Sequence, residues 1–338
     1  MNILAIESSC DETAVAVVEN GRIVKSDCIA SQVALHRVYG GVVPEIASRK
    51  HIEAIYGLAD EALSTAGISR QDIDAVAVTY APGLIGAVLV GVNFAKAAAL
   101  ALNKPLIPVH HIRGHIAANY LAFPELEPPF LCLVVSGGHT MIVDVQNYTK
   151  MQILGSTLDD AAGECFDKVA RVLGMPYPGG AALDRASCAG EENKYFLPRS
   201  KAGSNPLDMS FSGLKTAALN LIHHAQQVGE PLDIPGLCAS FSAAVSDTLI
   251  PRVEMAMRQT GRTKLAVAGG VAANSRIRKD LIECADRLQA KVYLPPLSLC
   301  GDNAAMIGAQ GYYEYLAGNV ADMELNAYAT KSILGETI

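Results

Sequence analysis

The amino-acid sequence contains one strand–turn–strand pattern twice, and this duplication is its strongest constraint on the fold. Residues 130–145 consist of an apolar run, a polar turn at 136–139 with two glycines, and a second apolar run. Residues 3–18 repeat the layout around a turn of serines and acids. β-Branched residues favour strands in both copies, and the glycines leave the backbone open to a ligand. The duplication predicts two domains, each with a loop that holds phosphate.

Chain length and element order also indicate two domains. A chain of 338 residues is too long for one ordinary core. Predicted strands alternate with helices, the strand–turn unit at 264–270 matches the one at 74–83, and 124–129 has the proline content of a linker. We predict an α/β fold with two lobes that face each other across a cleft. The predicted lobes are 1–129, completed by 308–338, and 130–307.

Composition favours a cytoplasmic protein. The eight cysteines form no Cys-x-x-Cys pair, which is typical of reduced thiols and not of a disulfide frame or a zinc knuckle. The most apolar stretch, 83–102, is interrupted by Asn93 and Lys96, so we expect a buried helix and no membrane span. The N-terminus lacks the basic region of a secretory signal.

The net charge of −7 gives no electrostatic sign of nucleic-acid binding. An RNA substrate would have to bind a local basic patch or a partner's surface. One candidate patch exists, although a solvated helix face explains it at least as well. It consists of Arg276, Arg278, Lys279, Arg287 and Lys291.

Two histidines at helical spacing form a candidate metal site. His111 and His115 are four residues apart, so on a helix both imidazoles can reach one ion, although a pair of unrelated surface or core histidines explains the spacing equally well. Ile112 stands where the zincin motif requires glutamate. The best source of a third, carboxylate ligand is Asp302, although its position before an apolar segment taken alone favours a helix N-cap.

Glycine loops and acids are the other candidate site residues. Residues 136–138 and 269–274 each follow a predicted buried strand, where backbone amides bind phosphate oxygens or simply form a tight turn. Neither has the Rossmann spacing, and 212–216 imitates the end of a Walker loop without its upstream glycine. Asp11 and Glu12 in the first turn are placed for proton transfer, although turn chemistry explains an acid there as often.

Taken together, these motifs resemble in order, and over essentially the whole chain, those of the tRNA adenosine threonylcarbamoyltransferases, once named O-sialoglycoprotein endopeptidases. His139 after the double glycine resembles the bacterial branch, and Cys165 and Gly301 are small departures. The matching segments are 7–13, 110–115, 135–140, 159–164, 166–168, 177–180, 211–216, 268–274 and 302–307.

The resemblance implies the actin-like ATPase (ASKHA) fold, with two RNase H-like lobes and a nucleotide cleft between them. It implies one divalent metal, Fe²⁺ in preference to Zn²⁺, held by His111, His115 and Asp302, with Ser136 or His139 nearby. The donor would be threonylcarbamoyl-adenylate. Its implied contacts are Val134, Val135, Ser136, Gly137, Gly138, Asp167, Gly180, Asp184 and Asn274.

The resemblance further implies transfer to the exocyclic amine of the adenosine 3′ to the anticodon, in tRNAs that read codons starting with A. Asp11, with Glu12 as second choice, would accept the amine proton. Implied partners are tRNA, a degenerate paralogue that lacks the histidine pair, and a small P-loop ATPase. The main alternative is a small-molecule kinase or ATPase of the same superfamily. A metalloprotease lacks its glutamate beside His111, and a non-catalytic scaffold predicts that His111→Ala leaves tRNA modification intact.

Overall fold

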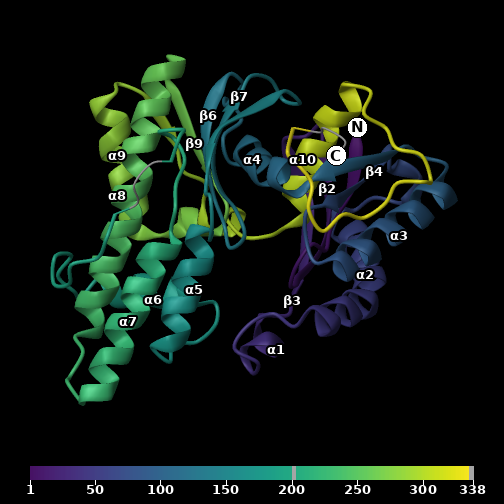
Figure 1. Ribbon diagram of the computed structural model, residues 1–338. Helices are drawn as coiled ribbons and strands as arrows, with labels where there is room; N and C mark the ends of the chain where they lie inside the picture. Colours follow the sequence, from purple (N-terminus) through teal and green to yellow (C-terminus); the bar gives the residue numbers. More distant parts are fainter. Residues whose placement is uncertain (200–202, 335–338) are drawn as a thin grey trace. The chain divides into compact units, whose positions relative to one another are not determined.

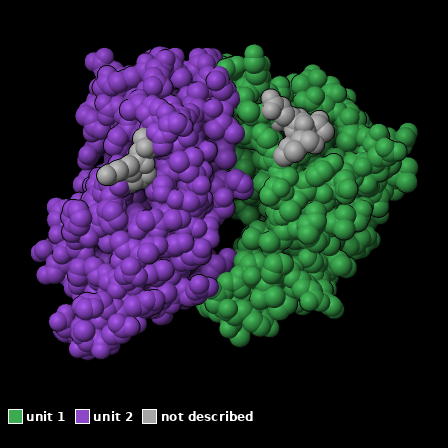
Figure 2. All heavy atoms as spheres, viewed as in Figure 1, with its two compact units in different colours: residues 1–128, 146–151, 295–338 green, residues 129–145, 152–294 purple. Residues whose placement is uncertain are grey.

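The computed structural model describes residues 1–199 and 203–334. The chain forms two compact units, shown in different colours in Figure 2. The first unit consists of Met1–Pro128, Gln146–Met151 and Pro295–Ile338, and the second of Pro129–Val145 and Gln152–Leu294. Within the described residues, each unit holds one five-stranded sheet.

The sheet of the first unit is built on the hairpin at 3–18, with the strand order β3-β2-β1-β4-β5. β1, β2 and β3 are antiparallel neighbours, whereas β4 and β5 run parallel to β1. Carboxyl ends of parallel strands meet at one edge of a sheet, and the candidate metal ligands gather there. The strands are β1 (Asn2–Glu7), β2 (Glu12–Glu19), β3 (Ile23–Ser31), β4 (Ala75–Ala81) and β5 (Leu106–His110).

Helices cover both faces of this sheet (Figure 1). Alternate residues of β1 point to opposite sides, and because both sets are apolar, each face needs a helical layer to bury it. Leu4 and Ile6 lie in an apolar core with α2 and α3, and Ile3 and Ala5 lie in one with α10. Helical elements of this unit are α1 (Val33–Arg37), α2 (Pro44–Ala66), η1 (Arg70–Asp72), α3 (Ile85–Leu102), α4 (His111–Ala122), η3 (Leu297–Leu299) and α10 (Ala304–Leu316).

Helix α3 coincides with the most apolar stretch of the sequence. Within the described part of the chain, it is the one helix long and apolar enough, by length and composition alone, to cross a membrane. Its residues Val88, Val92 and Ala95 are fully buried in the core of the first unit. Ile85 and Leu100 on the same helix are exposed.

The first unit contains two segments that the predicted second lobe included, 146–151 and 295–307. Tyr148 stacks on Tyr313 of α10, with ring centroids 3.7 Å apart, and Arg22 Nη2 donates a hydrogen bond of 2.9 Å to the Tyr148 hydroxyl. Met306 lies in the apolar core with Ile3. Aromatic stacking and apolar burial thus hold both segments in this unit.

The second unit repeats the topology of the first. Its strand order, β8-β7-β6-β9-β10, places the hairpin β6–β7 and the parallel strand β9 as β1–β2 and β4 are placed in the first unit. This repeat confirms the predicted duplicated α/β fold. Its strands are β6 (Phe130–Val135), β7 (Thr140–Val145), β8 (Met151–Ser156), β9 (Lys264–Ala268) and β10 (Lys291–Tyr293). Its helical elements are α5 (Ala162–Val172), α6 (Gly179–Ser187), α7 (Ser212–Val228), α8 (Ile234–Thr260), η2 (Gly270–Ala273) and α9 (Ser275–Arg287).

Candidate metal centre

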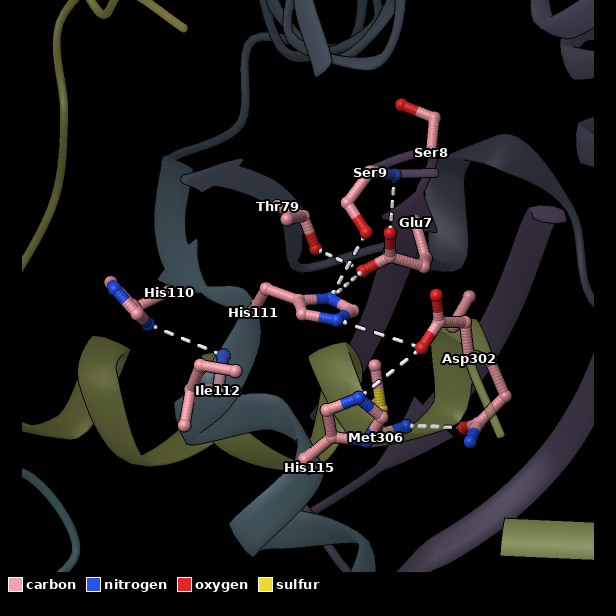
Figure 3. Close-up of polar contacts among 12 residues, drawn as sticks. Glu7, Ser8, Ser9, Thr79, His110, His111, Ile112, His115, Asp302 and Met306 are labelled. Atoms are coloured by element: carbon pink, nitrogen blue, oxygen red, sulfur yellow. Dashed lines mark hydrogen bonds and ion pairs between the residues drawn. The ribbon is translucent and has the colours of Figure 1, made fainter. Parts of the chain in front are cut away.

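Three side chains distant in sequence converge at the carboxyl edge of the first unit's sheet (Figure 3). His111 begins α4 and His115 follows one turn later, so both imidazoles lie on one face of the helix. Asp302 Oδ1 lies 3.5 Å from His111 Nε2 and 3.2 Å from His115 Nε2. One potential ligand atom from each residue lies within 4.8 Å of the other two. The structure therefore brings the three predicted ligands together.

The expectation that Asp302 caps a helix is wrong. Asn303 is the N-cap of α10, and its Oδ1 accepts a hydrogen bond of 2.9 Å from the Met306 amide. Because the neighbouring asparagine serves the helix, the carboxylate of Asp302 turns toward the two histidines.

The cluster has the donor chemistry of a transition-metal site. Two imidazole nitrogens and one carboxylate oxygen suit Fe²⁺ or Zn²⁺. Burial opposes a charge on His111, but the carboxylates of Glu7 and Asp302 outweigh it and raise the pKa of this imidazole to about 9. The surroundings thus favour a positive charge at this position, which a bound cation would supply in place of the proton. The described residues therefore fit a divalent metal.

Glu7, at the end of β1, orients the first of the two imidazoles. Its side chain is fully buried, and Oε2 lies 3.0 Å from His111 Nδ1. Since a carboxylate only accepts hydrogen bonds, Nδ1 carries the proton and Nε2 is left to bind a metal. Burial acts to raise the pKa of Glu7, but His111 holds it below its usual value. Among described residues, none hydrogen-bonds to His115 Nδ1.

The turn after β1 and the neighbouring strand β4 hold the Glu7 carboxylate in place. Oε1 accepts a hydrogen bond of 2.5 Å from the Ser9 amide, and Oε2 accepts one of 2.5 Å from Thr79 Oγ1 on β4. From the sequence, roles in this turn were predicted for Asp11 and Glu12 and none for Glu7. The sequence signal that was available is its place at the end of a predicted buried strand, whereas its nearness to His111 depends on the strand order, in which β4 lies between β1 and β5.

The turn after Glu7 is supported by α3 and the segment before it. The Leu84 amide donates a hydrogen bond of 2.8 Å to Ser9 O, and Ser8 Oγ donates one of 2.9 Å to Ala87 O. A Cβ on Gly83 would lie 2.5 Å from Ser9 O, and one on Gly91 would lie 2.3 Å from Ser8 Oγ. The backbone of Ser9 therefore leaves room only for glycine at position 83, and a side chain at position 91 would displace the Ser8 hydroxyl.

Asp11 and Glu12 follow in the same turn. Asp11 is buried, and its carbonyl oxygen accepts a hydrogen bond of 3.0 Å from the Gln32 amide. Glu12 Oε1 accepts one of 2.8 Å from Ser31 Oγ, while Glu12 Oε2 is buried with no hydrogen-bond partner among the described residues. Burial raises the pKa of Glu12 to about 7 against the hydrogen bond from Ser31, and the Asp11 carboxylate adds to the increase.

The glycine loop of the second unit lies at the end of β6. Val134 and Val135 have fully buried side chains, so only their backbone atoms can meet a ligand, whereas Gly137 and Gly138 are exposed. Gly269, with φ of +92°, lies behind the loop, where a Cβ would be 2.5 Å from Val135 O. The sequence prediction of an accessible glycine turn after a buried strand fits this arrangement.

The other predicted binding residues of the second unit make local hydrogen bonds. Asp167 Oδ1 accepts hydrogen bonds of 2.7 and 3.1 Å from the amides of Gly179 and Gly180 at the start of α6. Asp184 Oδ1 accepts one of 2.8 Å from Ser275 Oγ, and Asn274 caps α9. Ser136 and His139, which the resemblance placed near the metal, belong to this unit.

Two further sequence candidates have local structural roles. In the basic patch, Arg276 pairs with Asp280 and Glu192, Arg278 donates to Ala272 O at 3.0 Å, and Arg287 lies 3.5 Å from Glu254. These three arginines of the predicted patch thus have partners within the chain, and Lys291 lies on β10 and not on α9. In the Walker-like segment, Lys215 lies in the first turn of α7 and pairs with Asp160, which precedes α5.

Residues 24–309 match the family model described as tRNA N6-adenosine threonylcarbamoyltransferase. A protein of that name from Moorella thermoacetica is 54% identical over 326 residues, which cover 96% of this chain and 95% of the relative. Another of that name, from Clostridium perfringens, is 51% identical over 325 residues and 96% of each chain.

Solved structures with low sequence identity share the fold. HypF from T. kodakarensis has a TM-score of 0.62 at 13% identity, covering 96% of this chain and 49% of its own. Component A of (R)-2-hydroxyglutaryl-CoA dehydratase from Acidaminococcus fermentans has a TM-score of 0.54 at 13% identity, covering 94% and 99%. Such likeness shows the fold alone.

The fold and the sequence relatives together confirm the predicted actin-like fold class, the family and the transferase class of enzyme. The named relatives support the transferase and not the alternative small-molecule kinase. The chain belongs to the tRNA N6-adenosine threonylcarbamoyltransferase family.

Proposed function

We propose that this protein transfers the threonylcarbamoyl group of threonylcarbamoyl-adenylate to the exocyclic amine of the adenosine 3′ to the anticodon, in tRNAs that read codons starting with A. The product is N6-threonylcarbamoyladenosine. The observation that carries the proposal is the His111–His115–Asp302 cluster, whose two histidines are buried, in a chain about half identical to transferases of that name.

His111, His115 and Asp302 would hold one divalent metal, Fe²⁺ in preference to Zn²⁺. The metal, when bound, would supply Lewis-acid polarisation of the donor carbonyl. The contribution of Glu7 is to keep the proton on His111 Nδ1, so that Nε2 faces Asp302 with its lone pair available.

The acids of the first turn would handle the proton of the acceptor. As the adenine nitrogen forms its bond to the carbonyl carbon, the bond from that carbon to the phosphate oxygen breaks and AMP leaves. The amine proton passes to a carboxylate, for which we propose Asp11. Glu12 is the second candidate, because its buried Oε2 lacks a hydrogen-bond partner among the described residues and its pKa of about 7 suits a general base.

The second unit would bind the donor. Exposed backbone amides at Gly137 and Gly138 suit the oxygens of the adenylate phosphate. The polar groups around the starts of α6 and α9 suit the nucleoside. The proposed contacts are Val134, Val135, Ser136, Gly137, Gly138, Asp167, Gly180, Asp184 and Asn274.

The proposed partners are tRNA, a degenerate paralogue of the same fold and a small P-loop ATPase, all in the cytoplasm. The net charge is −7, and Arg276, Arg278 and Arg287 already have local partners. We therefore expect tRNA to bind through a surface that a partner completes.

The test is reconstitution from purified components. The chain is incubated with tRNA and synthetic threonylcarbamoyl-adenylate, with and without the two partners, and the nucleosides are analysed by mass spectrometry. We expect the modified adenosine with the parent chain and its loss with His111→Ala or Asp302→Ala. His224→Ala, at an exposed histidine of α7, is the control and should retain activity. Full activity of a metal-free His111→Ala protein would refute the proposed role of the cluster.

A further inference from the structure

Helix α2 carries a fully buried histidine that has no part in the mechanism above. His51 Nδ1 lies 2.7 Å from Thr13 Oγ1, and His51 Nε2 lies 3.0 Å from the carbonyl oxygen of Cys10. His51 has no exposed surface, and Thr13 is 1% exposed. Between the two partners of this single ring lie Asp11 and Glu12.

The contacts determine which nitrogen of the ring carries the proton. A carbonyl oxygen only accepts hydrogen bonds, so Nε2 donates to Cys10 O. In the neutral ring Nδ1 is then bare, and it accepts the hydroxyl proton of Thr13. Burial lowers the pKa of His51, which favours this neutral form. The Nε2–H donor of the ring thus faces a carbonyl acceptor, and its Nδ1 acceptor faces a hydroxyl donor.

The ring closes the turn from the side of α2. On the side of β3, the Gln32 amide donates a hydrogen bond of 3.0 Å to Asp11 O, and Ser31 Oγ donates one of 2.8 Å to Glu12 Oε1. The rigid ring of His51 is hydrogen-bonded to Cys10 O before Asp11 and to Thr13 Oγ1 after Glu12. It therefore fixes the distance between these two atoms and, with it, the direction of the Asp11 and Glu12 carboxylates.

We propose that His51 is a positioning residue for transfer, holding the Cys10–Thr13 turn so that its carboxylates meet the acceptor amine. This role rests on the proposed function. It places no demand on metal binding by His111, His115 and Asp302, nor on donor binding in the second unit.

The test compares kinetics and metal binding for matched variants of the full chain in the reconstituted system. His51→Ala removes both hydrogen bonds, whereas His51→Gln keeps a donor at the Nε2 position. Ile55→Ala is the control: Ile55 lies one turn further along α2, is 5% exposed and belongs to the apolar core. The control destabilises the same helix through packing alone.

We expect His51→Ala to lower kcat about 10- to 100-fold, with the KM for threonylcarbamoyl-adenylate within about twofold of the parent. Metal affinity should be unchanged, and His51→Gln should recover part of kcat. Amide hydrogen exchange in residues 10–13 should rise in His51→Ala and stay at the parent level in Ile55→Ala. Equal kcat for His51→Ala and Ile55→Ala, at equal folded fraction, would overturn the proposal.

The His51 ring forms a bridge of two hydrogen bonds between Cys10 O and Thr13 Oγ1. Should His51→Ala fail to fold, a second pair of variants tests this bridge at Thr13. Thr13→Val removes the hydroxyl with little change in shape, and Thr13→Ser retains it. We expect Thr13→Val to lower kcat as His51→Ala does and Thr13→Ser to stay near the parent; equal kcat for the two would refute the bridge. An inactive parent chain would instead contradict the proposed function, and hydrogen exchange would still report on the turn.

Discussion

The Glu7 carboxylate, fully buried at the end of β1, lies 3.0 Å from Nδ1 of His111. This contact sets the tautomer of the imidazole, so that Nε2 faces Asp302 at 3.5 Å. Ser9, the second residue after Glu7, adds to this contact, since its amide donates to Glu7 Oε1 and its hydroxyl lies 3.2 Å from His111 Nδ1.

Glu7→Gln should weaken metal binding. The amide keeps the shape of the side chain but loses the charge that makes His111 a stronger donor to the metal. We expect an affinity about 10- to 100-fold lower, measured by competition with a chelator. Glu19→Gln, at a partly exposed acid paired with Lys25, should leave the affinity unchanged. An equal affinity for Glu7→Gln and the parent would remove Glu7 from the metal site.

The two acids of the first turn can be separated by rate measurements. Asp11→Asn should slow transfer about 10²- to 10⁴-fold if Asp11 is the base, and metal content should not change. Glu12→Gln should act more weakly. If instead Glu12→Gln has the larger effect and abolishes a rise in rate near pH 7, the assignment passes to Glu12. An unchanged rate in both variants would exclude carboxylate base catalysis from this turn.

Gly269→Ala should distort the glycine loop at 136–138, which is proposed to bind the donor. Gly269 has φ of +92°, and a Cβ would lie 2.5 Å from Val135 O. We expect a loss of stability of about 1–3 kcal/mol and weaker binding of a non-reactive adenylate analogue, measured by calorimetry. The neighbouring Gly270→Ala is the control, because nothing lies within 4 Å of its Cβ. Similar analogue affinities for the two variants would show that the loop does not depend on this close approach.

Asp27 should make stability depend on pH. Burial raises the pKa of this carboxyl to about 6, against hydrogen bonds from the amides of Ala304 and Ala305. Because the folded state holds the proton more tightly than the unfolded chain, stability should fall as pH rises from about 4 to 6, by up to about 3 kcal/mol. Asp27→Asn should remove this slope in urea unfolding of the metal-free protein. A slope that survives the substitution would assign it to other groups.

Periodicity and repetition in the sequence predicted much of the fold. The two hairpins at 3–18 and 130–145 gave the duplicated sheets, since β-branched alternation is a local signal. The place of 146–151 in the first unit could not be predicted, because it depends on the stacking of Tyr148 on Tyr313 across a long stretch of chain.

The two histidine ligands of the candidate site could be predicted from the sequence, but the residues that orient the site could not. The four-residue spacing of His111 and His115 needs only a helix. Asp302 was ambiguous, because Asn303 beside it is an equally good cap and only the structure shows which one caps α10. The roles of Glu7 and His51 depend on which strands and helices lie side by side, and no spacing in the sequence encodes that.

The most direct test of the central claim is anomalous diffraction from crystals of the protein loaded with iron or zinc. We expect a single strong peak at about 2.0–2.3 Å from His111 Nε2, His115 Nε2 and an oxygen of Asp302. A protein that takes up the metal with no peak among these three side chains would contradict the claim.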